Sequence, residues 1–171
     1  VEMFFEPHTI VNRVSKFTVA DLQQISWETW KTTLPSAVDW SLNIYISNGG
    51  NYGTLGGEPY WAANNTGALA NQWNTWDTNS VNNHIRFYEH RFAGTSFGGA
   101  NLPFLSDITA GPIDWAAAGT TSTSTVDYRN WEVEAIAISV GSGWAATFEG
   151  YLDNFNFSLN NSGVTDTFTV D

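Results

Sequence analysis

Apolar and polar residues alternate one by one along long stretches of this chain, and helical periodicity is nearly absent. Every second residue from Val38 to Ile46 is apolar, and Trp40 belongs to that set. A period of two is typical of a half-buried strand, and the sequence NGGN at 48–51 is a turn signal. The segment therefore predicts a strand that ends in a tight turn, with Trp40 in the core.

Further strand signals lie in the second half of the chain. Residues 131–140 (WEVEAIAISV) begin with alternation and become apolar on both faces, as a central strand of a sandwich does. The aromatic-rich residues 144–159 predict a long final strand or strand pair, and residues 164–171 (VTDTFTVD) predict an edge strand. A helical turn is expected only at 18–25, with Thr18 as the N-cap and Asp21 at the third helical position.

Turn signals rich in Gly and Asn recur at intervals of about 8 to 15 residues, a spacing typical of all-β sandwiches. We therefore expect an all-β fold, a two-sheet antiparallel β-sandwich of the jelly-roll type, with at most one short helix near residues 19–25. A chain of 171 residues has the size of one domain, so a single domain spanning 1–171 is expected.

Composition narrows the classes of partner. The chain has 17 acidic and 6 basic residues and a net charge of −11, which opposes binding to nucleic acid. No cysteine is present, so disulfides and thiolate metal sites are excluded. No apolar stretch approaches the length of a membrane span, and residues 1–7 lack the basic start of a signal peptide, as a mature processed chain also would.

Aromatic and amide side chains occur together at 58–77, and this is the first candidate ligand site. A sugar ring offers an apolar C–H face that stacks on an indole and a rim of hydroxyls that binds amides and carboxylates. The alternative is that these rings belong to the core, although Trp73 and Trp76 should point to opposite faces, so at most one of them is a core residue. The predicted ligand-binding residues of this group are Tyr60, Trp61, Asn64, Asn65, Trp73 and Asp77.

Residues 84–92 (HIRFYEHRF) form the second candidate, a strand with His84, Arg86 and Tyr88 on one face. Such a row of donors suits a polyhydroxyl or anionic saccharide, and a Tyr base beside an Arg is also the equipment of a polysaccharide lyase. The alternative is a solvated outer face paired with neighbouring acids. As possible glycosidase carboxylates, Glu132 and Glu134 share a strand face with a backbone separation of about 6.5–7 Å, although such alternation is common.

A structural Ca2+ is the third candidate, with Asp153 as a ligand and Glu6 or Asp77 contributing from elsewhere. Strict alternation would place Asp153 on the same aromatic face as Tyr151 and Phe155, where a carboxylate needs a partner or a cation. The rival explanation is a hydrogen bond to a loop or an Arg. Three dispersed His residues without Cys argue against zinc, and no EF-hand spacing is present.

The run GSGWAATFEGYLDNF at 141–155 resembles the closing strand of secreted concanavalin-like or galactose-binding-like jelly-roll domains, found in extracellular and carbohydrate-active proteins. The resemblance implies the jelly-roll fold, extracellular residence and sugar binding. It also implies that the acid of the DN pair, here Asp153, helps to hold a structural calcium.

Together these features predict a secreted, non-catalytic carbohydrate-binding protein, a lectin or carbohydrate-binding module. Because lectins commonly gain strength by multivalency, a homo-oligomer is expected. One alternative is a structural subunit of an extracellular surface layer, filament or capsid, suggested by the polar run at 120–125 and the strand at 164–171. The other is a polysaccharide lyase or glycoside hydrolase, in which Tyr88 or Glu134 would be essential.

Overall fold

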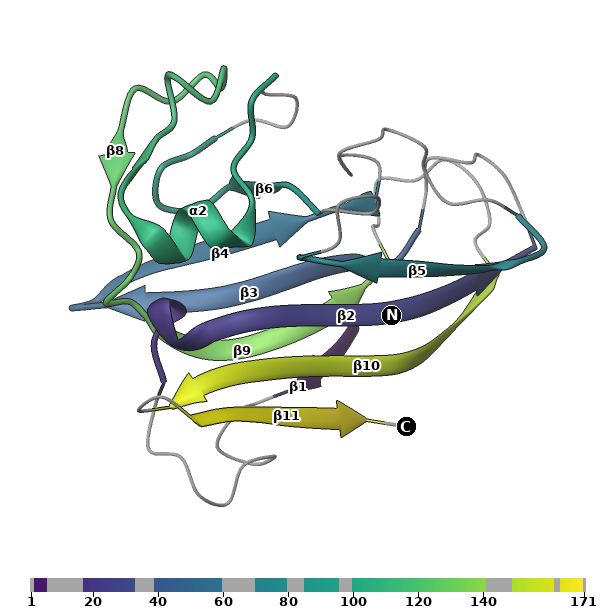
Figure 1. Ribbon diagram of the computed structural model, residues 1–171. Coiled ribbons are helices and arrows are strands. Elements are labelled where there is room, and N and C mark those ends of the chain that lie inside the picture. The colour runs from purple at the N-terminus through teal and green to yellow at the C-terminus, as the bar shows by residue number, and fades with distance from the viewer. Residues whose placement is uncertain are drawn as a thin grey trace.

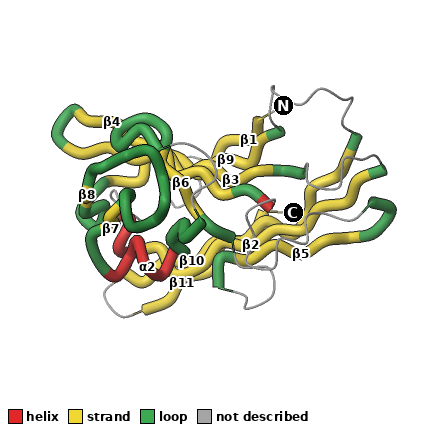
Figure 2. Tube along the Cα trace, turned by 90° about the horizontal axis from the view of Figure 1, so that it is seen from above, coloured by secondary structure: helices red, strands yellow, loops and turns green. Residues whose placement is uncertain are grey.

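Two antiparallel sheets pack face to face in a computed structural model that describes residues 2–5, 17–32, 39–59, 70–79, 85–95, 100–140, 149–161 and 164–170 (Figure 1). The five-stranded sheet has the order β1 (Glu2–Phe5), β9 (Glu132–Ser139), β3 (Ser41–Asn48), β4 (Asn51–Gly57), β6 (Phe87–Glu89). The four-stranded sheet has the order β11 (Val164–Val170), β10 (Gly150–Asn161), β2 (Leu22–Lys31), β5 (Trp73–Asp77). The predicted all-β, two-sheet antiparallel sandwich is confirmed, and Figure 2 shows its two layers from above.

Alternation along the strands builds the core between the sheets. In β3, Leu42, Ile44 and Ile46 are buried while the residues between them are half-buried, and Trp40 just before the strand is buried as predicted. The predicted turn joins β3 to β4, where Gly49 and Gly50 have φ angles of 56° and 88°. Positive φ at both central residues is what a tight hairpin turn requires, and glycine adopts it without strain.

The strand predicted at 131–140 is β9, which pairs with β1 on one side and β3 on the other. Its residues 135–138 are all buried, which explains why they are apolar on both faces. The tail forms β11, which among the described strands pairs with β10 alone and is the edge of its sheet, as predicted.

The helical prediction is partly wrong. A short 3-10 turn, η1 (Val19–Asp21), begins after Thr18, whose N–H and hydroxyl both donate to the Asp21 carboxylate. The chain enters β2 at Leu22, so residues 22–25 form a strand because Ile25 continues its buried face.

A second helix, α2 (Leu105–Ala110), contradicts the expectation of at most one. Its first turn is fixed by the Phe104 N–H, which donates to Asp107 Oδ2 at 2.9 Å, and it buries Leu105 and Ile108. Six residues are too few to give a readable helical period.

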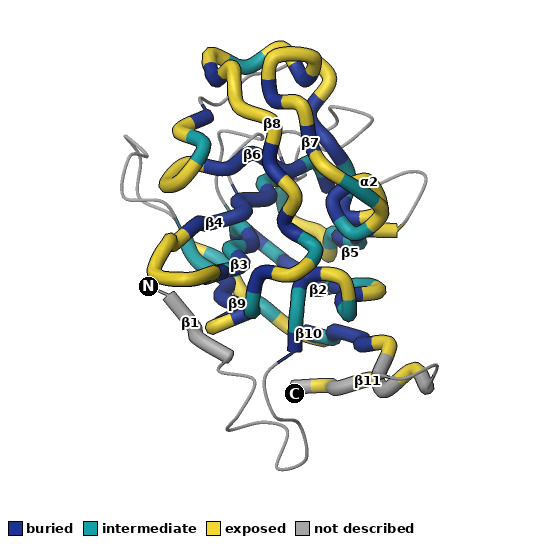
Figure 3. The backbone as a smooth tube through the Cα atoms, turned by 90° about the vertical axis from the view of Figure 1, so that its left-hand side faces the viewer, coloured by how far each residue is buried: buried dark blue, intermediate teal, exposed yellow. Residues whose placement is uncertain are grey.

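A small hairpin of β7 (Ile113–Asp114) and β8 (Thr125–Val126) lies with α2 at one end of the sandwich (Figure 3). The polar run at 120–125 forms the loop that enters β8, and most of its residues are exposed, as expected for a surface loop. In the part of the chain that the structure describes, no helix is long and apolar enough to cross a lipid bilayer.

Candidate functional site

Three aromatic side chains line up across neighbouring strands on the face of the four-stranded sheet that points away from the core, here called the outer face. In the strand register, Trp30 of β2 lies opposite Trp73 of β5 and opposite Tyr151 of β10. Trp73 is 50% exposed, Tyr151 is 58% exposed and Trp30 is half-buried. We call these residues the aromatic row. Large rings so exposed on adjacent strands are available to a ligand.

The alternation of β2 and β5 explains why these rings face outward. In β2 the residues Trp27, Thr29 and Lys31 are buried, so Trp30 points to the opposite side. In β5 the side chain of Trp76 is 1% exposed and its Nε1 donates to Thr29 Oγ1 at 2.8 Å. Trp73 and Trp76 therefore point to opposite faces, as predicted, and Trp76 is the one in the core.

A second row of side chains runs beside the aromatic row, two residues further along each strand. It contains Asp153, Glu28 and Thr75, which lie opposite one another in the strand register. We call it the acidic row. Glu28 accepts hydrogen bonds from Asn154 Nδ2 at 2.8 Å and from Thr75 Oγ1 at 3.4 Å. The Glu28 carboxylate is thereby held in one position between its neighbours.

A third row, Asn156, Ser26 and Asp77, completes the polar part of the outer face. Asp77 accepts from Gln24 Nε2 at 2.7 Å, and Asn156 accepts from the hydroxyl of Thr169 on β11. These bonds fix side chains that would otherwise be free to rotate.

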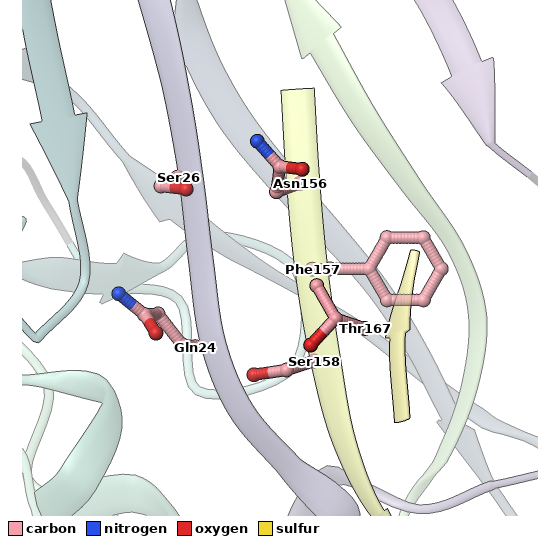
Figure 4. A pocket seen from close by; sticks show the side chains of 6 residues that line it. All are labelled: Gln24, Ser26, Asn156, Phe157, Ser158 and Thr167. Carbon is pink, nitrogen blue, oxygen red and sulfur yellow. The ribbon is translucent and has the colours of Figure 1, made fainter. Parts of the chain in front are cut away.

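A small hollow lies in this polar region (Figure 4). Its lining residues come from β2, β10 and β11 and are Gln24, Ser26, Asn156, Phe157, Ser158 and Thr167. Its volume of about 40 Å³ has room for a few water molecules, and pockets that enclose a ligand are roughly 300–1,000 Å³. A ligand of this region would therefore lie across the outer face.

The premise for calcium at Asp153 is wrong, because β10 contains a β-bulge. Asp153 pairs with Glu28 and Asn156 with Ser26, so Asn154 and Phe155 together lie opposite one residue of β2, and Asn154 has a φ of 49°. The extra residue turns Phe155 into the core, while Asp153 stays outside with an exposed carboxylate that accepts the Asn154 N–H at 2.8 Å.

No buried charge at Asp153 therefore calls for a cation. Among the described residues, no three His, Asp or Glu side chains gather as a metal site, and Glu6 lies outside the described ranges. Calcium stays a prediction, which thermal unfolding with and without a chelator tests. A binding ion would raise the free energy of unfolding by about 2.7 kcal/mol at a hundredfold excess over Kd.

Of the predicted ligand-binding residues, the structure places Trp73 and Asp77 together on the outer face, at the two ends of β5. Tyr60, Trp61, Asn64, Asn65 and His84 lie outside the described residues. Tyr88 belongs to β6 of the five-stranded sheet, and Arg86, just before it, forms an isolated bridge with Phe104.

The proposed donor row at 84–92 is not an open face. The Arg86 guanidinium donates to the Leu102 carbonyl at 3.0 Å and lies over the ring of Phe104, 4.6 Å from its centroid. Tyr88 is 4% exposed, and its hydroxyl donates to Glu58 Oε1 at 2.9 Å. Burial, together with the charge of Glu58, raises the pKa of Tyr88, so the phenol stays protonated. Both side chains have structural partners that the sequence pattern does not reveal.

Glu132 and Glu134 share one face of β9, as predicted, and belong to the five-stranded sheet. Glu134 is exposed and accepts a hydrogen bond from the Ser47 hydroxyl of β3. They lie on a different sheet from the aromatic row.

Sequence reasoning missed Trp30, Tyr151 and Glu28 as members of the outer face. The alternation of residues 25–31 contained the signal for Trp30 and Glu28. It places both side chains on the face of the strand that does not carry the buried Ile25 and Trp27. Comparison with protein-family models, curated proteins and solved structures finds no match for the chain.

Proposed function

We propose that this protein is a non-catalytic carbohydrate-binding protein, a lectin or carbohydrate-binding module, whose site is the outer face of the four-stranded sheet. The observation that carries the proposal is the aromatic row, in which Trp73, Trp30 and Tyr151 lie on adjacent strands. Adjacent strands are about 4.8 Å apart, so the row spans roughly 10 Å, enough to contact more than one sugar ring.

The chemistry of the neighbouring rows supports a sugar over a purely apolar ligand. A sugar ring stacked on an indole directs its hydroxyls sideways, toward the acidic row and toward Asn156 and Asp77. Carboxylate and amide groups are the acceptors and donors that hydroxyls need. Hydrogen bonds such as Gln24 to Asp77 hold these groups in place before binding, which lowers the entropy lost on association.

The rings of the aromatic row do not form one plane. The centroids of Trp30 and Tyr151 are 5.6 Å apart and their planes are inclined by 51°. Adjacent strands in a sheet are also rotated by roughly 20–25° relative to one another. This arrangement favours a single, twisted oligosaccharide or polysaccharide chain over a flat crystalline surface.

The structural-subunit alternative has one supporting observation. In the part of the chain that the structure describes, the edge strand β11 pairs with β10 alone, and its own residues Thr165, Thr167 and Thr169 are exposed. A free edge can add a strand from another chain. Secretion and homo-oligomerisation remain predictions of the carbohydrate-binding proposal. A lyase that uses Tyr88 receives less support, because Tyr88 is buried and bonded to Glu58.

A glycan array of neutral, amino and acidic saccharides, probed with the labelled protein, tests the proposal. We expect binding to at least one glycan class, and binding that is lost in a Trp73→Ala and Tyr151→Ala double variant. The matched control is Tyr52→Ala on β4, because Tyr52 is 64% exposed but belongs to the other sheet. Absence of binding to every glycan, with the protein shown to be folded, would refute the proposal.

A further inference from the structure

The outer face combines exposed rings with negative charge, and the described residues of its four strands bring no positive charge to it. Glu28, Asp77 and Asp153 are its carboxylates. The four strands of this sheet contain a single basic residue, Lys31, and its side chain is fully buried on the opposite face. A ligand that stacks on the aromatic row therefore meets carboxylates without a competing cation from these strands.

We infer that the glycan bound by this face carries free, protonated amino groups, as in an oligomer or polymer of an amino sugar. The inference rests on the proposed function and names the ligand class of the same site. A neutral glycan would meet the same rings, but it would leave the charge of the acidic row uncompensated.

The register places charge where the substituents of a stacked sugar would lie. Along β2, Glu28 is two residues from Trp30, and along β10, Asp153 is two residues from Tyr151, on the same face in each case. Two residues along a strand correspond to about 6.5–7 Å. A sugar ring lying on the aromatic row therefore has the acidic row beside its edge, where an amino substituent can reach a carboxylate.

Glu28 and Asp153 are themselves cross-strand neighbours. Like charges directly opposite each other on antiparallel strands destabilise a sheet. The Glu28 carboxylate receives neutral donors, from Asn154 and Thr75, so the negative charge at this pair is hydrogen-bonded but not neutralised by them. An ammonium group bound between the two carboxylates would relieve this repulsion.

The rings of the aromatic row also favour a positively charged ligand. An ammonium group near the face of an indole or phenol is attracted by the ring quadrupole. The aromatic and acidic rows therefore both favour a cationic glycan. Both disfavour uronic acid or sulfated glycans, whose charge has the same sign as that of the carboxylates.

Isothermal titration calorimetry with three oligosaccharides of equal length tests the inference. The ligands are a glucosamine oligomer with free amines, its fully N-acetylated counterpart and a uronic acid oligomer, all titrated at about pH 6. We expect the free-amine oligomer to bind roughly tenfold more tightly than the N-acetylated one, and the uronic acid oligomer to bind most weakly.

Charge variants separate this site from general attraction by the net charge of −11. Glu28→Gln and Asp153→Asn should each reduce the ratio of the affinity for the free-amine oligomer to the affinity for the N-acetylated oligomer, because an amide can still form hydrogen bonds with hydroxyls but carries no negative charge. Asp127→Asn is the control, because it removes one charge from an exposed pair with Arg129, remote in sequence from the four strands.

Two results would overturn the inference. One is equal or tighter binding of the N-acetylated oligomer by the wild type, and the other is a loss of preference in Asp127→Asn as large as in Glu28→Gln. Both would leave the proposed function standing. If none of the three oligosaccharides and no glycan on the array binds, the proposed function fails and the inference fails with it.

Discussion

Trp30 and Tyr151 lie directly opposite each other on β2 and β10, and their ring centroids are 5.6 Å apart. The two residues are 121 positions apart in the sequence, so only the pairing of the first and last long strands of the sheet brings them together. Trp73 extends the contact to a third strand, β5. The proposed ligand surface therefore depends on the sheet as a whole.

Replacement of Trp73 by Ala should weaken glycan binding by roughly 10- to 100-fold, because the variant loses the buried area and the stacking contribution of one ring. Stability should change by less than about 1 kcal/mol, since the side chain is half exposed. Titration calorimetry with the best glycan from the array measures the first effect and urea unfolding the second. If Trp73→Ala bound the glycan as tightly as the control Tyr52→Ala does, the ligand would not lie on the aromatic row.

Gly56 is required by the close approach of Tyr88. A Cβ at Gly56 would lie 2.5 Å from Tyr88 Cζ and 2.7 Å from its hydroxyl oxygen. Gly56→Ala should therefore lower the free energy of unfolding by about 1–3 kcal/mol, as overpacked cores do. Gly111→Ala is the control, because nothing lies within 4 Å of its Cβ position and its φ is −174°. Equal unfolding midpoints for the two variants in urea would contradict this packing.

Glu89 is a fully buried carboxylate that organises a loop. It accepts backbone N–H groups from Thr54 on the neighbouring strand and from all residues of 91–93. Glu89→Gln should destabilise the protein by about 2–4 kcal/mol, because one acceptor oxygen becomes an NH2 group that faces a donor. Guanidinium unfolding measures the change. The control is Glu134→Gln at an exposed position, which should change the free energy of unfolding by less than about 0.5 kcal/mol. Similar values for both variants would disprove the structural role of Glu89.

Glu58 should make stability depend on pH with a defined sign. Burial raises its pKa above the ordinary value of 4.5, and the hydrogen bond from Tyr88 opposes that rise in part. The folded state then holds the proton to higher pH than the unfolded state, so the free energy of unfolding falls as the pH rises from 4.5 through the raised pKa.

Glu58→Gln keeps an acceptor for Tyr88 and has no titration of its own. We therefore expect the stability of the wild type relative to this variant to decrease across that pH range and to level off above it. Urea unfolding of both proteins at a series of pH values checks this. A relative stability that is flat with pH, or that rises, would show that the folded state does not raise the pKa.

The period-two pattern predicted the sandwich and the buried face of β3, but it did not predict β2, whose residues 22–25 were expected in a helical turn. The alternation placed Trp40 in the core and Trp73 and Trp76 on opposite faces, because a period of two fixes which residues share a face of the strand. Strand order was not predictable in the same way. The aromatic row needs β10, β2 and β5 to be neighbours, and residues within one strand carry no signal about which distant segment lies beside it.

Local exceptions to alternation explain the remaining errors. Tyr88 and Glu89 are adjacent in the sequence and are both buried, since one packs over Gly56 and the other binds the loop at 91–93. Simple alternation assigns one of the two to solvent, which is why the segment 84–92 was interpreted as an open row of donors. The short helix α2 escaped prediction because it depends on the Asp107 cap and not on a repeated pattern.

The bulge at Asn154 divides β10 into two parts of opposite phase. Before it the odd-numbered residues Tyr151 and Asp153 face the solvent, and after it the even-numbered residues Asn156 and Ser158 share the face of Ser26 and Gln24. Deleting one residue here would invert the second half, sending Phe157 to the solvent and Asn156 into the core. The length of this segment is thus constrained by the opposite phases of its two halves, and homologous sequences should show no gap between 153 and 156.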